Sequence, residues 1–426
     1  MTGRTRTPKQ GRPMNQASTT DASLNDAAIA TRIWPLLGAC ALGLVPFTIY
    51  SNFLVDITRN SGHDATLMGS LRGVGGVAAL LVGLTCAPLL DRVPRRSAVI
   101  WSLLLLAAAC VVGLVGPVWA WALFCLLVGA ATSVLNPAAS AMAADRFDDE
   151  STSGRAATQV SAVMTLTAVL SAPLLAGPAV WWGWRGDLIA TAVLCSALAM
   201  ALFLARPASA EHSTADRNGP GTGYLRSFRI ASTLASVPML LAASALRTAA
   251  FMGQLAYLAV LYDERFHLGA GVFSLVWTLS GLSFFLGNWF GGFAIRRADN
   301  PVVTAIAGAV AAMVGAVAVL VLFLTDHLPA ALLATAALGV SHAVLAAAMT
   351  TLLVRQSGGH RGTVLGLNGA GQSLGVCLGA SVAGLGAMAW GWHGAGFVLA
   401  GLTAGACFAS LAAARRLNVE YRRERS

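Results

Sequence analysis

The chain has 426 residues, of which 56% are hydrophobic and only 11% are charged. A single water-soluble core does not need so large an apolar share, so a soluble enzyme or binding domain is excluded. The net charge of +10 is carried mainly between long apolar runs, where anionic membrane lipid is a nearer partner than nucleic acid. We therefore expect an integral membrane protein without a nucleic-acid partner.

Twelve apolar runs follow one another along the chain. A helix rises about 1.5 Å per residue and the hydrocarbon layer is about 30 Å thick, so each run is long enough to span a bilayer. Residues 1–31, in which Met14 is an alternative start, and residues 417–426 are expected to be cytoplasmic tails, the first of them disordered. The predicted spans are residues 33–55, 65–87, 97–117, 119–143, 156–180, 184–205, 237–262, 269–294, 301–324, 328–353, 362–388 and 392–414.

The basic residues predict the orientation of these spans. When alternate loops are assigned to opposite sides, all but five of the 28 Lys and Arg residues lie on the side shared by both termini. Arg59, Arg185 and Arg265 lie on the other side, and Arg72 and Arg247 lie inside spans. The positive-inside rule then predicts a multi-pass protein of the cell membrane with both termini in the cytoplasm.

The second half of the chain repeats landmarks of the first. Residues 207–236 are expected to form a cytoplasmic linker between a six-helix bundle at 32–206 and another at 237–416. A parallel repeat of six spans, with the binding site between the halves, is a known plan of transporters. The landmarks, at offsets of 204 to 208, are Arg92 with Arg296, Arg155 with Arg361, and Gly183-Trp184-Arg185 with Gly391-Trp392-His393.

The loop between spans 2 and 3 is similar to the Gly-x-Leu-Ala-Asp-Arg-x-Gly-Arg-Arg motif of the major facilitator superfamily, although Ala87 and Pro94 replace its glycines. The chain resembles this family over residues 32–416. The resemblance implies an all-α integral membrane fold of twelve transmembrane helices in two pseudo-symmetric six-helix bundles. It also implies a cytoplasmic gate that holds that side shut in the outward-facing state; a charged turn that only sets topology is the alternative. The gate residues would be Asp91, Arg92, Arg95 and Arg96.

Span 5 carries Ala172-Pro173-Leu-Leu-Ala176-Gly177, similar to the Gly-Pro-x-x-Gly-Gly element of drug-exporting antiporters in the superfamily. Close packing by small residues explains it equally well. Exporters of this type carry a buried Arg, linked to proton coupling, where this chain has Cys125. The resemblance implies a secondary active transporter, a monomer without cofactors, that exports a small organic solute against protons. An organic-anion importer or exchanger and a non-transporting receptor or scaffold are the alternatives.

Two buried bases give the sharper indication of a substrate. Arg72 and Arg247 lie about eight and eleven residues into their spans, near the membrane midplane, where a charge costs at least about 2.5–3.5 kcal/mol. We expect them to face an aqueous cavity or a partner, and their excess over acids favours an anionic substrate; structural arginines are the alternative. The expected substrate-binding residues are Arg72, Arg247, Gln254, Tyr257, Asn136 and Asn368.

Acidic residues are absent from the middle of every predicted span, although proton-coupled carriers usually bury a carboxylate there. The candidates for proton coupling are therefore Asp56 at the end of span 1, Asp187 at the start of span 6, and His342, the one histidine inside a span. The alternatives are that Asp187 complements a helix dipole and that His342 is a packing residue. No phosphate loop, carboxylate pair or His/Cys metal cluster is present in the sequence, which predicts neither an enzyme nor a metal protein.

Overall fold

The computed structural model describes most of the two predicted bundles. The gate residues Asp91 and Arg92, most of the predicted linker and residues 1–24 lie outside the described residues. The described residues are 25–90, 93–147, 149–205, 229, 233–234, 236–297, 300–357 and 360–423.

The first half is a helical bundle whose spans agree closely with prediction. Span 1 differs, because the helix breaks at Phe53 and a short amphipathic helix, α2, follows it. We call the end of the molecule that carries α2 the α2 end, and the opposite one, where α1 begins, the terminal end. The helices are α1 (Asp26–Asn52), α2 (Leu54–Ser61), α3 (Ala65–Leu90), α4 (Arg95–Gly113), α5 (Val118–Ala144) and α6 (Glu150–Leu204).

The second half is built in the same way. Its span 8 is divided into α9, a π-helical turn and α10, because the backbone of Gly287 lies against Val340 of α12 and the helix widens at that contact. The helices are α8 (Val237–Phe266), α9 (Ala270–Leu286), η2 (Gly287–Gly291), α10 (Gly292–Arg297), α11 (Pro301–Leu324), α12 (Leu328–Gln356) and α13 (Arg361–Arg423).

Two helices each contain two spans joined by a glycine turn. Gly183 has φ 59° and ψ −158° inside α6, and Gly391 has φ 62° and ψ −155° inside α13. This backbone conformation belongs to glycine, since any Cβ is strained there. The repeated Gly-Trp landmarks therefore mark equivalent turns, and the chain makes twelve crossings. The first and second limbs of α6 are residues 150–182 and 184–204.

Both outer boundaries of the bundles differ from prediction. Helix α1 begins at Asp26, ahead of the expected start at residue 32, because Asn25 caps it by accepting a hydrogen bond from the Ala28 amide (2.8 Å). An ion pair from Arg155 to Asp26 ties this turn to α6. Helix α13 continues to Arg423, beyond the expected end at residue 416. The sequence alone missed both turns because they are polar.

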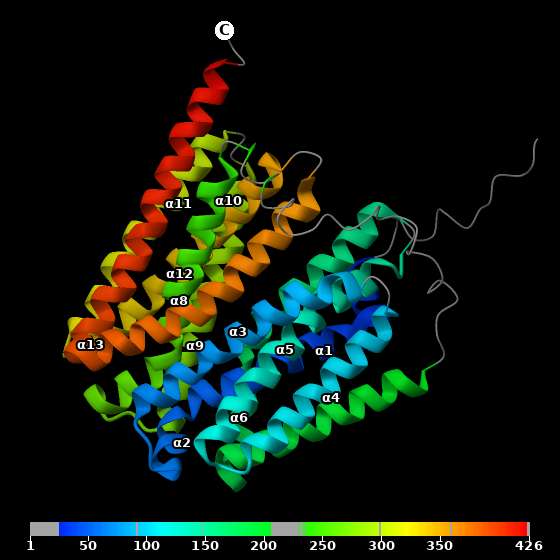
Figure 1. The fold of residues 1–426 in the computed structure, drawn as a ribbon, viewed down its shortest axis with the longest axis vertical. Helices are drawn as coiled ribbons and strands as arrows, with labels where there is room; N and C mark the ends of the chain where they lie inside the picture. The colour runs from blue at the N-terminus through cyan, green and yellow to red at the C-terminus, as the bar shows by residue number, and fades with distance from the viewer. Residues whose placement is uncertain are drawn as a thin grey trace, which may run out of the picture.

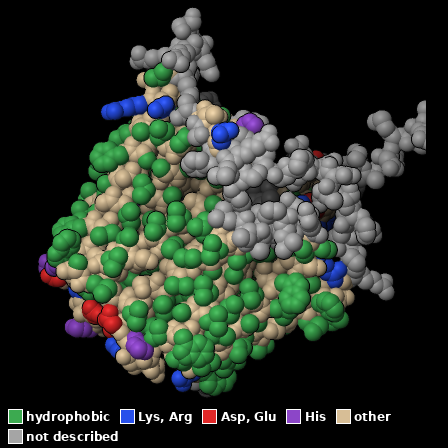
Figure 2. All heavy atoms as spheres, in the orientation of Figure 1, with side chains coloured by type: hydrophobic (Ala, Val, Ile, Leu, Met, Phe, Trp, Pro, Cys, Tyr) green, Lys and Arg blue, Asp and Glu red, His purple; other side chains and the backbone are tan. Residues whose placement is uncertain are grey.

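The surface is that of a membrane protein. Figure 2 shows hydrophobic side chains across the middle of the face and charged ones at its two ends. Among the described residues, ten helices are long and apolar enough to cross a membrane. Exposed tryptophans lie near the ends of the spans, as in the aromatic belts at membrane interfaces. They include Trp34, Trp101, Trp119, Trp182 and Trp390.

The two halves lean together at the α2 end (Figure 1). There α3 packs on the first limb of α13 through glycines, because a Cβ at Gly73 would lie 2.7 Å from the carbonyl oxygen of Cys377, and Gly76 lies against the same residue. Within each half glycine again lets backbones touch, at Gly75 with Gly129 and at Gly379 with Ala249. Such contacts let helices associate where lipid provides no hydrophobic drive.

We predict that Gly391→Ala lowers the free energy of unfolding by about 1–3 kcal/mol through backbone strain alone. Gly401→Ala is the matched control: neither position has an atom within 4 Å of an added Cβ, but Gly401 is helical, without a positive φ. That control should be neutral or mildly stabilising. Thermal unfolding of the purified variants in detergent measures both effects. Equal unfolding midpoints for Gly391→Ala and Gly401→Ala would show that a side chain does not strain the turn.

Candidate functional site

Helix α8 places Arg247 inside the second half. Its guanidinium is 7% exposed and donates one hydrogen bond, from Nη2 to the hydroxyl of Thr248 at 2.9 Å. Nε has no hydrogen-bond partner among the described residues, and no carboxylate among them pairs with this side chain. A buried donor without a partner costs about 1–3 kcal/mol, so Arg247 is poised to bind an acceptor.

His342 of α12 lies against α8, one helical turn along from Arg247. Its ring centroid is 5.1 Å from that of Phe251, which in turn stacks on Phe284 at 5.2 Å. Nδ1 has no partner among the described residues. The imidazole therefore offers an unused polar atom next to an aromatic wall and a guanidinium.

Two amides add further unused polar atoms. Gln254 lies on the same face of α8 as Arg247, seven residues or two turns along, and neither atom of its amide has a partner among the described residues. Asn368 of α13 likewise has a free carbonyl oxygen, whereas Gln372 donates to the hydroxyl of Ser244 at 3.2 Å. We call Arg247, Gln254 and His342 the α8 cluster.

Arg72 comes from the first half and reaches the second. From α3, its guanidinium donates to the hydroxyl of Ser51, lies 5.6 Å from the ring of Phe47, and has Nη2 3.8 Å from the sulfur of Met252. Met252 is five residues beyond Arg247, or about 7.5 Å along α8. Arg72 therefore reaches α8 from the first half, at a residue roughly a turn and a half along the helix from Arg247, which belongs to α8 itself.

Arg72 also lies beside Cys125 of α5, close enough for an electrostatic interaction. A guanidinium from α3 is thus present next to the position where exporters of the resembling branch carry their Arg. Asn136, further along α5, has a side-chain oxygen without a partner among the described residues and lies near Gly43 of α1. It belongs to the first half, outside the α8 cluster.

Tyr257 has a different environment from the α8 cluster. It is fully buried, with its ring against Gly69 of α3, and its hydroxyl lies 3.2 Å from the carbonyl oxygen of Thr66 and 3.1 Å from that of Ala380. The one proton of this hydroxyl is shared between two carbonyl acceptors. The hydroxyl therefore joins α3 to the second half. The structure gives Tyr257 a joining contact between the halves.

Polar contacts at the α2 end join the halves further. Arg59 of α2 pairs with Asp263 of α8 at 2.9 Å, and the indole of Trp392 donates to Glu264 at 2.8 Å within the second half. We call Arg59, Asp263 and Tyr257 the outer latch. Sequence reasoning missed the ion pair, although the offset of 204 between Arg59 and Asp263 equals that of the repeat and could have indicated equivalent positions.

The described gate residues tie the first half together at the terminal end. Arg95 pairs with Asp145 at the end of α5, and Arg96 donates to carbonyls at the end of α6, with Nε 3.0 Å from that of Leu202. Asp91 and Arg92 are outside the described residues, so a contact from this loop to the second half remains an expectation.

The acidic candidates lie apart from the α8 cluster. Asp56 is half-buried on α2 next to the outer latch; burial raises the pKa of its carboxyl, Arg59 lowers that pKa and Asp263 raises it. Asp187 is 1% exposed on the second limb of α6, and neither carboxylate oxygen has a partner among the described residues. Of the three coupling candidates, only His342 belongs to the α8 cluster.

The comparisons with known proteins agree with this architecture. The family model described as "Major Facilitator Superfamily" matches residues 36–325. The chain belongs to the Major Facilitator Superfamily. Members of this family are multi-pass membrane transporters of small molecules, and the twelve crossings of this chain agree with its membership.

The chain is also similar to curated relatives and to solved structures. The chain is 30% identical, over 182 residues, to proteins described as chloramphenicol efflux pumps of two Mycobacterium tuberculosis strains, and spans 43% of their length with 42% of its own. Its fold matches an inward-facing, unoccupied bacterial homologue of the lysosomal transporter Spinster (TM-score 0.71, 16% identity, 92% and 95% coverage). The nucleoside transporter NupG (0.71, 14%, 89% and 99%) and the human organic anion transporter MFSD10 (0.63, 18%, 89% and 98%) share the fold.

We predict that Arg59→Ala shifts the chain toward the form in which the α2 end is open. The side chains of Arg59 and Asp263 are 65% and 20% exposed. An ion pair with this exposure contributes up to about 1 kcal/mol, so its loss should change the ratio of open to closed forms by up to about fivefold. The measurement is the rate at which an impermeant thiol reagent, added at the α2 side, modifies Thr66→Cys in a background without the seven native cysteines. The swapped pair, Arg59→Asp with Asp263→Arg, should restore slow labelling; unchanged labelling in Arg59→Ala contradicts the latch.

Proposed function

We propose that this transporter exports a small organic solute across the cell membrane by alternating access, in exchange for protons. The solute binds between the halves, on the α8 cluster and Arg72. The observation that carries the proposal is the set of unpartnered polar atoms of the α8 cluster, on the helix that Arg72 of the other half contacts at Met252. Buried polar groups are normally paired, so unused ones between two moving bodies favour a ligand.

The proposed direction of transport is supported by the expected orientation of the chain in the membrane and by its relatives. The distribution of Lys and Arg favours a cytoplasmic terminal end. With that orientation the outer latch closes the extracellular side, and the chain has the inward-facing form in which an exporter takes up its solute. The chloramphenicol efflux pumps, which share part of their sequence with this chain, support export.

Arg72 and Arg247 favour a solute with a carboxylate or another strong acceptor group. Neither pairs with a carboxylate among the described residues, and a guanidinium presents planar, forked donors that match such groups. The same observation supports the second candidate function, an importer or exchanger of organic anions. Paired vesicles separate the two: an exporter accumulates solute in inverted vesicles when their interior is acidic, and an importer does so in right-side-out vesicles.

We predict that Arg247→Ala abolishes transport of the solute and that Arg247→Lys impairs it strongly. A hydrogen bond to a charged group contributes about 1.5–3 kcal/mol, so affinity should fall roughly tenfold or more in the alanine variant. Lysine keeps the charge but loses the fork. Arg72 variants should follow the same order with smaller losses.

Binding to purified protein and flux in proteoliposomes measure these effects. Arg416→Ala is the control, because Arg416 is an exposed guanidinium on α13 away from the cluster, and it should leave affinity unchanged. Transport at the parental rate by Arg247→Ala, or a substrate range made up only of cations, would mean that these arginines are structural.

Proton coupling should depend on Asp56, Asp187 or His342. Because the pKa of Asp56 is raised when the α2 end is closed, the closed form binds this proton more tightly than a form in which Asp56 is solvated. As pH falls through the raised pKa, toward the ordinary value of 3.8, the closed form is therefore favoured. An extracellular proton would thus help to return the carrier to its inward-facing form.

We predict that substrate-driven proton movement in proteoliposomes disappears when the responsible residue is neutralised, by Asp56→Asn, Asp187→Asn or His342→Gln. Asp56→Asn should also remove the acid-induced closure of the α2 end. A pH-sensitive dye inside the vesicles reports the first effect, and the labelling of Thr66→Cys reports the second. Proton movement that survives in the triple variant would exclude all three residues as the coupling group.

A further inference from the structure

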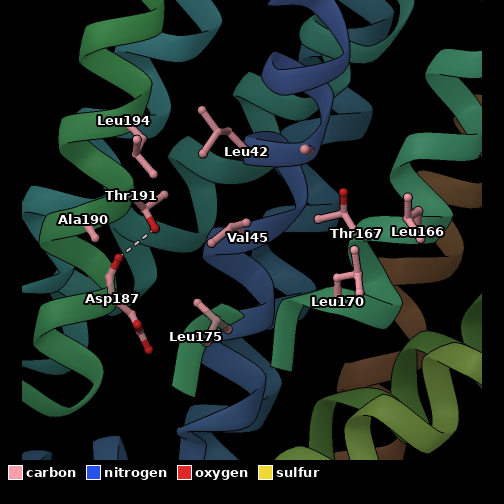
Figure 3. A pocket seen from close by; sticks show the side chains of 11 residues that line it. Leu42, Val45, Leu166, Thr167, Leu170, Leu175, Asp187, Ala190, Thr191 and Leu194 are labelled. Atoms are coloured by element: carbon pink, nitrogen blue, oxygen red, sulfur yellow. Dashed lines mark hydrogen bonds between the residues drawn. The ribbon is translucent and has the colours of Figure 1, made fainter. Parts of the chain in front are cut away.

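A separate pocket lies in the first half, between α1 and the two limbs of α6. Its volume is about 310 Å³, and the α8 cluster contributes nothing to its lining. Figure 3 shows its side chains pointing into it from the three helical segments. The lining includes Leu42 and Val45 of α1, Leu166 and Leu170 of the first limb, and Asp187 and Leu194 of the second.

The one ionisable side chain of this lining is Asp187. Both of its carboxylate oxygens are buried and lack a partner among the described residues, so Asp187 does not cap the second limb through a hydrogen bond. In Figure 3 it lies at the opposite end of the lining from Leu194. A carboxylate in apolar surroundings is costly unless a proton or a cation neutralises it, and the lining supplies no basic group.

The two threonines of the lining leave only acceptors facing the pocket. Thr191 donates its hydroxyl proton to the carbonyl oxygen of Asp187 at 2.7 Å, and Thr167 donates to that of Val163 at 2.8 Å. A hydroxyl whose proton is used can still accept a hydrogen bond. Each polar side-chain atom of the pocket can therefore accept a hydrogen bond, and the carboxylate is best matched by a positively charged donor.

The rim of the pocket opens on the lipid-facing surface. Leu166, Leu170 and Leu194 are 45%, 42% and 55% exposed, on helices that cross the membrane. Asp187 is four residues after the Gly183 turn, so it lies about 6 Å along the second limb from the α2 end of the membrane. A ligand can thus enter from the bilayer with its apolar part against the leucines and its polar part toward the α2 end.

We propose that this pocket is a second binding site, which takes a lipophilic primary amine in its protonated form. The ammonium donates to the Asp187 carboxylate, and the hydrocarbon part lies against the leucines of α1 and α6. The pocket volume is near the lower limit of about 300 Å³ for sites that hold drug-sized ligands, which favours a single-chain solute over a two-chain phospholipid. The site has the opposite charge preference to the α8 cluster and does not depend on it.

The test is photolabelling of the full-length protein in phosphatidylcholine nanodiscs with decylamine that carries a diazirine at the chain end. Labelled peptides identified by mass spectrometry should come from α1 and both limbs of α6. The matched probe is decanol with the same diazirine, which has the chain without the charge. We expect labelling by the amine to fall at least about tenfold in Asp187→Asn, the loss that corresponds to a hydrogen bond to a charged group.

Leu170→Trp fills the pocket from an exposed rim position and should block labelling even if Asp187→Asn fails to fold. Arg247→Ala, which disables the proposed transport site, should label like the parent protein, so the two proposals fail separately. Equal labelling by amine and alcohol, or labelling that survives both pocket variants, would overturn the site. Suppression of labelling by phosphatidylethanolamine as strong as by free decylamine would also overturn it, because the occupant would then be a lipid headgroup.

Discussion

The close approach of helix backbones at glycine determines how the rest of this molecule is arranged. In lipid, apolar side chains gain little by leaving one helix surface for another, so helices associate by close contact of small residues. Gly73 and Gly76 bring α3 against Cys377 of α13, and Gly69 on the same helix receives the ring of Tyr257. This contact positions Arg72 so that it reaches Met252 of α8, the helix that also carries Arg247.

A contact that depends on a few glycines can also be broken during transport. The α3 interface is made by small residues and one tyrosine hydroxyl shared between two carbonyls. The Arg59 to Asp263 pair adds only a surface interaction of modest strength. The halves are therefore held at the α2 end by many weak terms. In the transport cycle that we propose, a solute bound by Arg72 and Arg247 would compete with these terms on a similar scale of a few kcal/mol.

Sequence reasoning predicted the spans because the length and apolarity of a span are direct consequences of the bilayer. The repeat located the turns at Gly183 and Gly391, but the positive φ that both glycines share is seen only in the folded backbone. Sequence reasoning placed Arg72 and Arg247 inside the membrane but could not find their neighbours, since contacts with Met252 or His342 depend on helix rotation. The break at Phe53 was missed, because the hydropathy of the surrounding run does not report it. The distinct surroundings of Asp187 and Tyr257 likewise come from packing between helices.

We propose that the two ends of the molecule open in alternation. Spin labels at Asn60 and His267 report the distance between the halves at the α2 end, and labels at Leu204 and Val419 report it at the terminal end, in a background without native cysteines. Distance distributions from pulsed electron resonance, with and without Arg59→Ala and over a pH series, should change reciprocally. The α2-end distance should lengthen as the terminal-end distance shortens. Two distances that lengthen together, or that never change, would contradict alternating access.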